Sequence, residues 1–132
     1  MGIFVQYIHH SLQRYDTCGD WWFDEHGSLQ VRVSMMDDKR SMEAVALHEI
    51  IEALLCRAHG VPEEEVSRFD KQYEAMRTPH DTSEPGDEPD APYHVEHRAA
   101  TLIEKKYLSH LGVSWKEHTE TVNNLPDWIP AG

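Results

Sequence analysis

The first forty residues carry their apolar side chains in the short patterns that are typical of β-strands. Residues 3–8 form a brief apolar run, whereas residues 20–24 and 29–33 alternate apolar and polar positions around the turn Glu25-His26-Gly27-Ser28. The pattern predicts a short strand at 3–8, followed by a β-hairpin.

The longest helical pattern runs between residues 41 and 60. Ser41 belongs to the residue types that cap the start of a helix, and Gly60 to those that follow its end. A second helix is predicted over 62–77, because proline is favourable in a first helical turn. Its apolar stripe consists of Val66, Phe69, Tyr73 and Met76.

Residues 78–92 interrupt the helical pattern. This segment holds four prolines and one glycine among acidic and small polar residues, which predicts an irregular loop. Helical spacing returns over 93–111, where Gly112 is the stop signal, and Ser114 is placed to cap a short last helix before a proline-containing tail.

Strands that precede helices, without alternation, describe an α+β domain. We expect an N-terminal β-hairpin or small antiparallel sheet packed on three to four helices. A chain of 132 residues is long enough for one core but too short for two. The single domain 1–132 is expected to comprise a β-rich part (1–40), a long helix (41–60), a second helix (62–77), a loop (78–92), a third helix (93–111), and a short helix with a tail (112–132).

Charge and composition exclude several classes of function. Twelve Lys and Arg residues stand against 24 Asp and Glu, and the net charge of −12 repels phosphate backbones, so we expect no nucleic-acid partner. We expect no membrane partner either, because no apolar stretch approaches the roughly 20 residues that a membrane helix needs. The N-terminus lacks the pattern of an export signal, and Cys18 and Cys56 are expected to be free thiols, which together indicate a cytoplasmic protein.

Ten histidines are an unusual number for a chain of this length. Imidazole is both a proton carrier and a metal ligand near neutral pH, so composition alone does not assign a role. Most of the histidines occupy polar stretches without partner spacing, and we expect six of them on the surface: His9, His10, His26, His80, His110 and His118.

The helix predicted over 41–60 carries a narrow polar arc. At about 100° per residue, His48, Glu49 and Glu52 fall within one arc of roughly 100°, and His59 shares it. The arc also contains Val45 and Cys56 rather than lysine or glutamine, so the helix is expected to be buried on most sides. The opposite side is continuously apolar and consists of Leu47, Ile50, Ile51, Leu54, Leu55 and Ala58.

Residues four apart on a helix lie one above the other, so the His48 imidazole and the Glu52 carboxylate are able to bind one cation together. A third ligand is expected from the helix over 93–111, where His97 falls on the core-facing stripe. His94, Glu96 and Glu104 remain alternatives for this ligand, and Glu104 is also a candidate to hold His97 by a hydrogen bond.

Two histidines and a carboxylate form a ligand set well suited to catalytic zinc, with Mg²⁺ or Mn²⁺ as alternatives. Such a set leaves one position open for water, whose pKa the metal lowers toward neutrality. Glu49, beside the ligands, is then the candidate catalytic base.

The segment LHEIIEALL resembles the metal-binding helix of zincin metallopeptidases, with HExxE in place of HExxH. The resemblance implies that His48 binds zinc and that Glu49 is the base. Glu52 stands where zincins have their second histidine, so its role as a ligand follows from helical spacing instead. The order of hairpin, metal helix and ligand helix is also zincin-like over residues 20–111.

A second resemblance covers the segments DWWFD, LHEIIEALLC and APYHVEH. It is to small uncharacterised phage and prophage proteins and implies no activity. For a phage protein, the expected compartment is the cytoplasm of the host.

These observations favour a zinc-dependent hydrolase that cleaves a peptide or amide bond in a peptide or small-molecule substrate. One alternative is a magnesium-dependent nucleotide pyrophosphohydrolase that uses Glu49, Glu52 and Glu96. Another is a non-catalytic phage binding protein in which the metal only fastens two helices together. Tyr93 is a further candidate as a donor to an oxyanion, although packing is its more common role, and Asp70 is expected to be solvated.

Overall fold

Three strands form a mixed sheet with β3 in the middle. The computed structural model describes residues 1–78 and 81–129, and its sheet has the order β1 (Ile3–Ile8), β3 (Leu29–Ser34), β2 (Gly19–Phe23). The predicted hairpin is confirmed, since β2 pairs with β3 in the antiparallel sense. β1 pairs with β3 in the parallel sense, so the expectation of an antiparallel sheet needs correction.

The reason for the mixed sheet lies in the path of the chain. Residues between β1 and β2, including the 3₁₀ turn η1 (His10–Leu12), carry the chain past the position of β3 to the far edge of the sheet. The hairpin then returns β3 to the middle in the same direction as β1. Apolar alternation indicates a strand but contains no information about its direction, so the sequence pattern did not predict that β1 and β3 are parallel.

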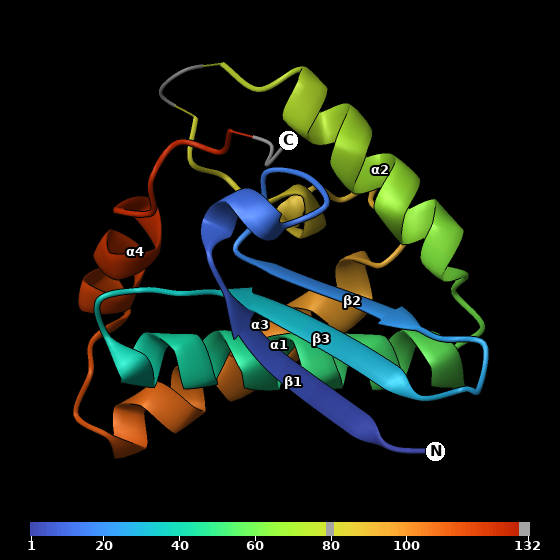
Figure 1. The fold of residues 1–132 in the computed structure, drawn as a ribbon, viewed down its shortest axis with the longest axis horizontal. Helices are drawn as coiled ribbons and strands as arrows, with labels where there is room; N and C mark the ends of the chain where they lie inside the picture. Colours follow the sequence, from blue (N-terminus) through green and yellow to red (C-terminus); the bar gives the residue numbers. More distant parts are fainter. Residues whose placement is uncertain (79–80, 130–132) are drawn as a thin grey trace.

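Four helices follow the sheet. They are α1 (Lys39–Ala58), α2 (Glu63–Ala75), α3 (His94–His110) and α4 (Trp115–Asn123), and a short 3₁₀ turn, η2 (Pro85–Asp87), lies in the predicted loop. The predicted α+β class is therefore confirmed. Figure 1 shows α1 and α3 lying together behind the sheet, with α2 and α4 on opposite sides of the molecule.

The start of α1 differs from the prediction. Asp38 caps the helix by accepting a hydrogen bond from the backbone N–H of Arg40, so the helix begins three residues earlier than a cap at Ser41 would allow. Ser41 is instead fully buried. The end agrees with the prediction, because Gly60 has a φ of +72°, the left-handed conformation that glycine adopts after a helix.

The main core lies between the sheet and α1. The inward-facing side chains of β3 (Leu29, Val31 and Val33) are buried and belong to the same cluster as Met42, Val45 and Ala53 of α1. At about 25 cal/mol per Å² of apolar surface, such side chains each contribute roughly 1.5–3 kcal/mol on burial. This packing fixes α1 against the sheet and so fixes the position of its polar arc.

The polar arc of α1 is its most deeply buried face. His48, Glu49 and Glu52 are 6%, 9% and 5% exposed, because this face lies against α3 and the sheet. The apolar side that we expected to be buried is only half-buried at Leu47, Ile50 and Ile51.

On α2, Val66 is buried and Phe69 packs on the core, as predicted, but Met76 is 82% exposed and lies outside the helix. The predicted stripe is therefore too long by one turn. No helix among the described residues has both the length and the apolar character needed to cross a membrane.

Candidate metal centre

α1 and α3 bring His48, Glu52 and His97 together inside the protein. Each offers a ligand atom within 4.8 Å of the others, and all three side chains are buried. Glu52 Oε2 lies 3.0 Å from His48 Nε2 and 2.9 Å from His97 Nδ1. The expectation that His97 points inward from α3 toward the polar arc of α1 is thus confirmed.

A carboxylate lies behind His48. The Nδ1 of His48 donates to Glu104 Oε1 at 2.8 Å, which leaves Nε2 directed at Glu52. Glu104 also accepts a hydrogen bond from His118 Nε2 at 2.5 Å, and His118 Nδ1 lies 2.9 Å from the hydroxyl of Ser41. Metal-binding histidines commonly donate their second N–H to such a carboxylate, which fixes the tautomer and the ring orientation.

This arrangement corrects two expectations. Glu104 contacts His48 rather than His97, and His118 is a buried residue of α4 rather than a surface residue. No local pattern identifies His118 as a buried residue, because its partners lie 14 and 77 residues away along the chain.

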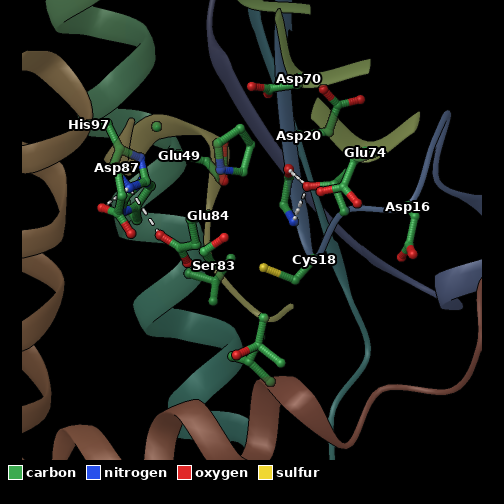
Figure 2. A pocket seen from close by; sticks show the side chains of 18 of the residues that line it. Asp16, Cys18, Asp20, Glu49, Asp70, Glu74, Ser83, Glu84, Asp87 and His97 are labelled. Carbon is green, nitrogen blue, oxygen red and sulfur yellow. Dashed lines mark hydrogen bonds and ion pairs between the residues drawn. The ribbon is translucent and has the colours of Figure 1, made fainter. Parts of the chain in front are cut away.

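His97 also has carboxylates on its far side. Its Nε2 lies 3.0 Å from Glu84 Oε2 and 3.3 Å from Asp87 Oδ1, without an aligned hydrogen bond to either. Figure 2 shows both carboxylates next to the ring. Gly86 allows this approach, because a Cβ at that position would come within 2.3 Å of His97 Cγ. The loop predicted over 78–92 therefore contributes directly to the centre.

The hairpin contacts Glu52. Trp21 of β2 is buried, and its indole N–H donates to Glu52 Oε1 at 3.0 Å. Glu52 Oε1 is therefore held by a neutral donor, while Oε2 faces both histidines. No local sequence pattern identifies this contact, although strand alternation does direct Trp21 and Trp22 to opposite faces of the sheet.

The histidines and carboxylates of the cluster shift one another's pKa values. Burial by itself raises the pKa of Glu52, but hydrogen bonds from the two histidines outweigh it and lower the pKa to about 2. Burial disfavours the cationic form of His97, yet the carboxylates of Glu52 and Glu84 raise its pKa to about 10. The pKa of His48 is raised well above its usual value for the same reason. Protons on two imidazoles therefore occupy the space between the ligand atoms, where a metal ion would replace them.

Glu49 lies beside this cluster and lines a cavity. Its carboxyl group makes no hydrogen bond or ion pair with the described residues, although the side chain is 9% exposed. Burial and the neighbouring Glu52 carboxylate raise its pKa well above the usual range. Gly19 of β2 makes room for it, because a Cβ there would come within 2.4 Å of Glu49 Oε1.

The cavity has a volume of about 900 Å³, and His48, Glu52, His97 and Glu49 all line it. Its walls come from β2, α1, α2, α3, α4 and the 81–87 loop. Carboxylates face it from several sides, whereas the cationic Lys and Arg side chains among the described lining residues are Arg77 and Lys105. Figure 2 shows His97 with Glu84 and Asp87 on one side of the pocket, and Asp70 and Glu74 on the other.

Asp70 belongs to this cavity and is not a solvated residue. It is partly buried and accepts hydrogen bonds from the hydroxyl groups of Tyr15, at 3.0 Å, and Tyr93. Burial raises its pKa to about 7 in spite of these donors. Because the Tyr93 hydroxyl already donates to Asp70, the geometry gives no support to a role for Tyr93 as an oxyanion donor.

Other candidate ligands lie apart from the centre. Glu96 pairs with His59 Nδ1 at 2.6 Å, and His94 donates to the carbonyl of Gly86 at 3.0 Å. Among the described residues, the cation-binding groups include neither of them, nor Glu49. This arrangement disfavours a magnesium site made from Glu49, Glu52 and Glu96.

The surface assignment is also wrong for His10, which is 4% exposed and lies between Ser34 and Asp16 at 2.8 and 3.0 Å. His80 lies outside the described residues. Cys18 and Cys56 are free thiols, as predicted, and Cys56 is a buried core residue.

Comparisons with protein-family models, with curated proteins and with solved structures found no match. The functional assignment therefore rests on the geometry of this site.

Proposed function

We propose that this chain is a zinc-dependent hydrolase that cleaves a peptide or amide bond, with His48, Glu52 and His97 as zinc ligands. The observation that carries the proposal is the direction of the two imidazoles. Each has one nitrogen toward the same oxygen of Glu52 and the other toward a carboxylate on its far side. An ion-pair cluster without a metal does not require each imidazole to contact carboxylates through both of its nitrogens. Metal-binding histidines, in contrast, commonly direct one nitrogen to the metal and the other to a carboxylate.

The donor set fits zinc better than magnesium. Two imidazole nitrogens and one carboxylate are a common set for catalytic zinc, whereas magnesium prefers oxygen ligands and retains several waters. Zinc held by three protein ligands has an open position for water and acts as a Lewis acid.

Glu49 is placed to handle protons. Its carboxyl group has no partner among the described residues and lies on the wall of the cavity next to the ligands. Burial and the negative charge of Glu52 hold its pKa high in the metal-free protein. A cation bound by Glu52 offsets this charge and lowers the pKa of Glu49, so that its carboxylate accepts a proton from the attacking water and returns it to the leaving amine.

Metal analysis tests the ligand assignment. Protein purified without added metal is expected to contain about one zinc per chain, as measured by inductively coupled plasma mass spectrometry. His48→Ala and His97→Ala are expected to lose this zinc, because a buried site with two protein ligands is too weak to retain it. His59→Ala is the matched control, since His59 also pairs with a glutamate but lies outside the ligand group. Full zinc occupancy in His48→Ala would contradict the assignment.

Glu49→Gln tests catalysis separately from binding. We expect this variant to keep its zinc and to lose hydrolysis of a mixed peptide library, followed by mass spectrometry, by at least about 100-fold. Library cleavage by Glu49→Gln at the wild-type rate would contradict the role of Glu49. Zinc binding without any cleavage by the wild-type protein would favour the non-catalytic alternative, and magnesium-dependent nucleotide hydrolysis would favour the pyrophosphohydrolase.

A further inference from the structure

Asp70 differs from most other carboxylates on the cavity wall in the donors that hold it. Tyr15 and Tyr93 donate hydrogen bonds to its two oxygens, one each. Tyrosine hydroxyls orient the carboxylate but bring no positive charge. The carboxylate therefore has a fixed orientation and no cationic partner among the described residues.

Neighbouring carboxylates already have cationic partners. Glu74, one turn along α2, accepts two hydrogen bonds from Arg77 at 2.7 and 2.8 Å. Asp20 accepts two from Arg14, at 2.7 and 2.9 Å. Because Asp70 has no such partner among the described residues, an external cation would provide the charged partner that Glu74 and Asp20 already have.

Asp70 and the proposed zinc ligands open onto one cavity. Asp70 lines it from α2, and His48, Glu52 and His97 line it from α1 and α3. With a volume of about 900 Å³, the cavity is large enough for several residues of a peptide. A ligand that reaches the metal therefore passes through a space in which negative charge prevails, as it does over the whole chain.

We propose that Asp70 binds the positively charged nitrogen group of the substrate, an ammonium or guanidinium, and so makes the enzyme selective for cationic peptides. This inference rests on the proposed function, since it assigns a substrate class to the same site. The charged nitrogen belongs either to a Lys or Arg side chain or to a free N-terminus, and both offer the same chemistry to a carboxylate.

Three hydroxamates test the inference, because the hydroxamate group binds zinc and removes the need for a known substrate. Nα-acetyl-lysine hydroxamate carries a side-chain charge, norleucine hydroxamate a free α-ammonium group, and Nα-acetyl-norleucine hydroxamate neither. Their affinities for the zinc-loaded full chain are measured by calorimetry at low ionic strength. We expect one of the charged compounds to bind about tenfold more tightly than the neutral one, and the compound that does so identifies the source of the charge.

Asp70→Asn is expected to abolish this preference, because asparagine has no charge. Its Oδ1 accepts a hydrogen bond from one tyrosine, and its amide N–H donates to the hydroxyl oxygen of the other, so the side chain keeps polar contacts with both. Glu74→Gln is the matched control: it removes the same charge from the same helix, yet Arg77 already neutralises that carboxylate. It should keep the preference within about twofold. Circular dichroism and zinc content establish that each variant is folded and loaded.

The outcomes separate the two proposals. Equal binding of all three compounds to the wild-type protein would overturn the inference about Asp70 and leave the zinc site intact, whether or not the variants fold. A preference that survives Asp70→Asn, or that is lost equally in Glu74→Gln, would overturn it as well. If none of the hydroxamates binds to the zinc-loaded protein, the proposal of an open coordination position on the zinc is contradicted. The inference about Asp70 is then contradicted as well, because it depends on that proposal.

Discussion

At the scale of single residues, the centre depends on side chains that hold other side chains. Glu104, Trp21 and Glu84 contact the proposed ligands and position them without occupying the space between them. The three proposed ligands were chosen from helical spacing and residue type. Glu104 was expected to position His97 and contacts His48 instead, and the contacts of Trp21 and Glu84 were not predicted. Their partners lie between 13 and 56 residues away in sequence, so only the fold relates them.

Glu104→Gln is expected to weaken zinc binding about 10- to 100-fold, because the amide removes the charge that increases the basicity of His48 and of the cluster as a whole. Zinc affinity is measured by competition with a chromophoric chelator. Glu43→Gln is the control, since Glu43 on α1 accepts a hydrogen bond from Tyr107 and is not part of the centre. Unchanged affinity in Glu104→Gln would show that this carboxylate does not support the metal.

Asp70 makes stability depend on pH. Its pKa of about 7 lies above its usual value of 3.8, so between these values the folded protein binds more protons than the unfolded chain. The free energy of unfolding therefore falls as the pH rises from about 4 to 7, and the contribution of Asp70 levels off above that window. Relative to wild type, metal-free Asp70→Asn should gain on the order of 1–2 kcal/mol across this range.

Urea unfolding of chelator-treated protein at pH 4 to 8 measures this effect. Glu74→Gln serves again as the control, because its carboxylate is already paired with Arg77. Unfolding free energies of wild type and Asp70→Asn that run parallel over the whole range would be inconsistent with the raised pKa.

At the scale of secondary-structure elements, α1 carries two of the proposed ligands within one turn, and α3 carries the third. Helical periodicity predicted both helices and the inward direction of His97, because a period of about 3.6 residues determines which side chains share a face. The cap of α1 was predicted three residues too late, since Asp38 and Ser41 are both acceptable caps and local preference alone does not choose between them. The loop around η2 was predicted to be irregular, but its part in the centre was not foreseen.

Gly86→Ala tests the contribution of this loop. A Cβ at residue 86 would lie 2.3 Å from His97 Cγ, so either the ring or the loop must move, and we expect zinc affinity to fall at least about tenfold. Gly19→Ala is the comparison, because its Cβ would meet Glu49 Oε1 rather than a ligand. It should retain zinc and lose hydrolysis. If Gly86→Ala bound zinc as tightly as wild type, the close packing of the loop on His97 would be irrelevant to the metal.

At the scale of the whole molecule, the centre joins parts that are far apart in the chain. The hairpin, α1, the loop and α3 all contact it, so a bound metal links the sheet side of the protein to its C-terminal helices. Binding to the folded state alone stabilises a protein by an amount that depends only on ligand concentration and affinity. Zinc should therefore stabilise the entire fold and not only the site.

Removal of zinc is expected to lower the thermal midpoint of unfolding by on the order of 10 °C, which corresponds to about 2.7 kcal/mol when free zinc is at 100 times its dissociation constant. Differential scanning calorimetry with and without a chelator measures the change. His48→Ala should show no response to the chelator, whereas His59→Ala should respond as wild type does. A wild-type midpoint that is insensitive to chelation would argue against a metal that bridges α1 and α3.

The sequence by itself determined the α+β class, the helices, the hairpin and the shared face of His48 and Glu52, because periodicity and residue type are local properties of the chain. Only the tertiary structure decided that β1 runs parallel to β3 and that His118, Trp21 and the 84–87 loop surround the ligands. It also placed the uncompensated charge of Asp70 in the same cavity. These features depend on contacts between residues distant in sequence, and such contacts are set by how the elements pack together rather than by any local pattern.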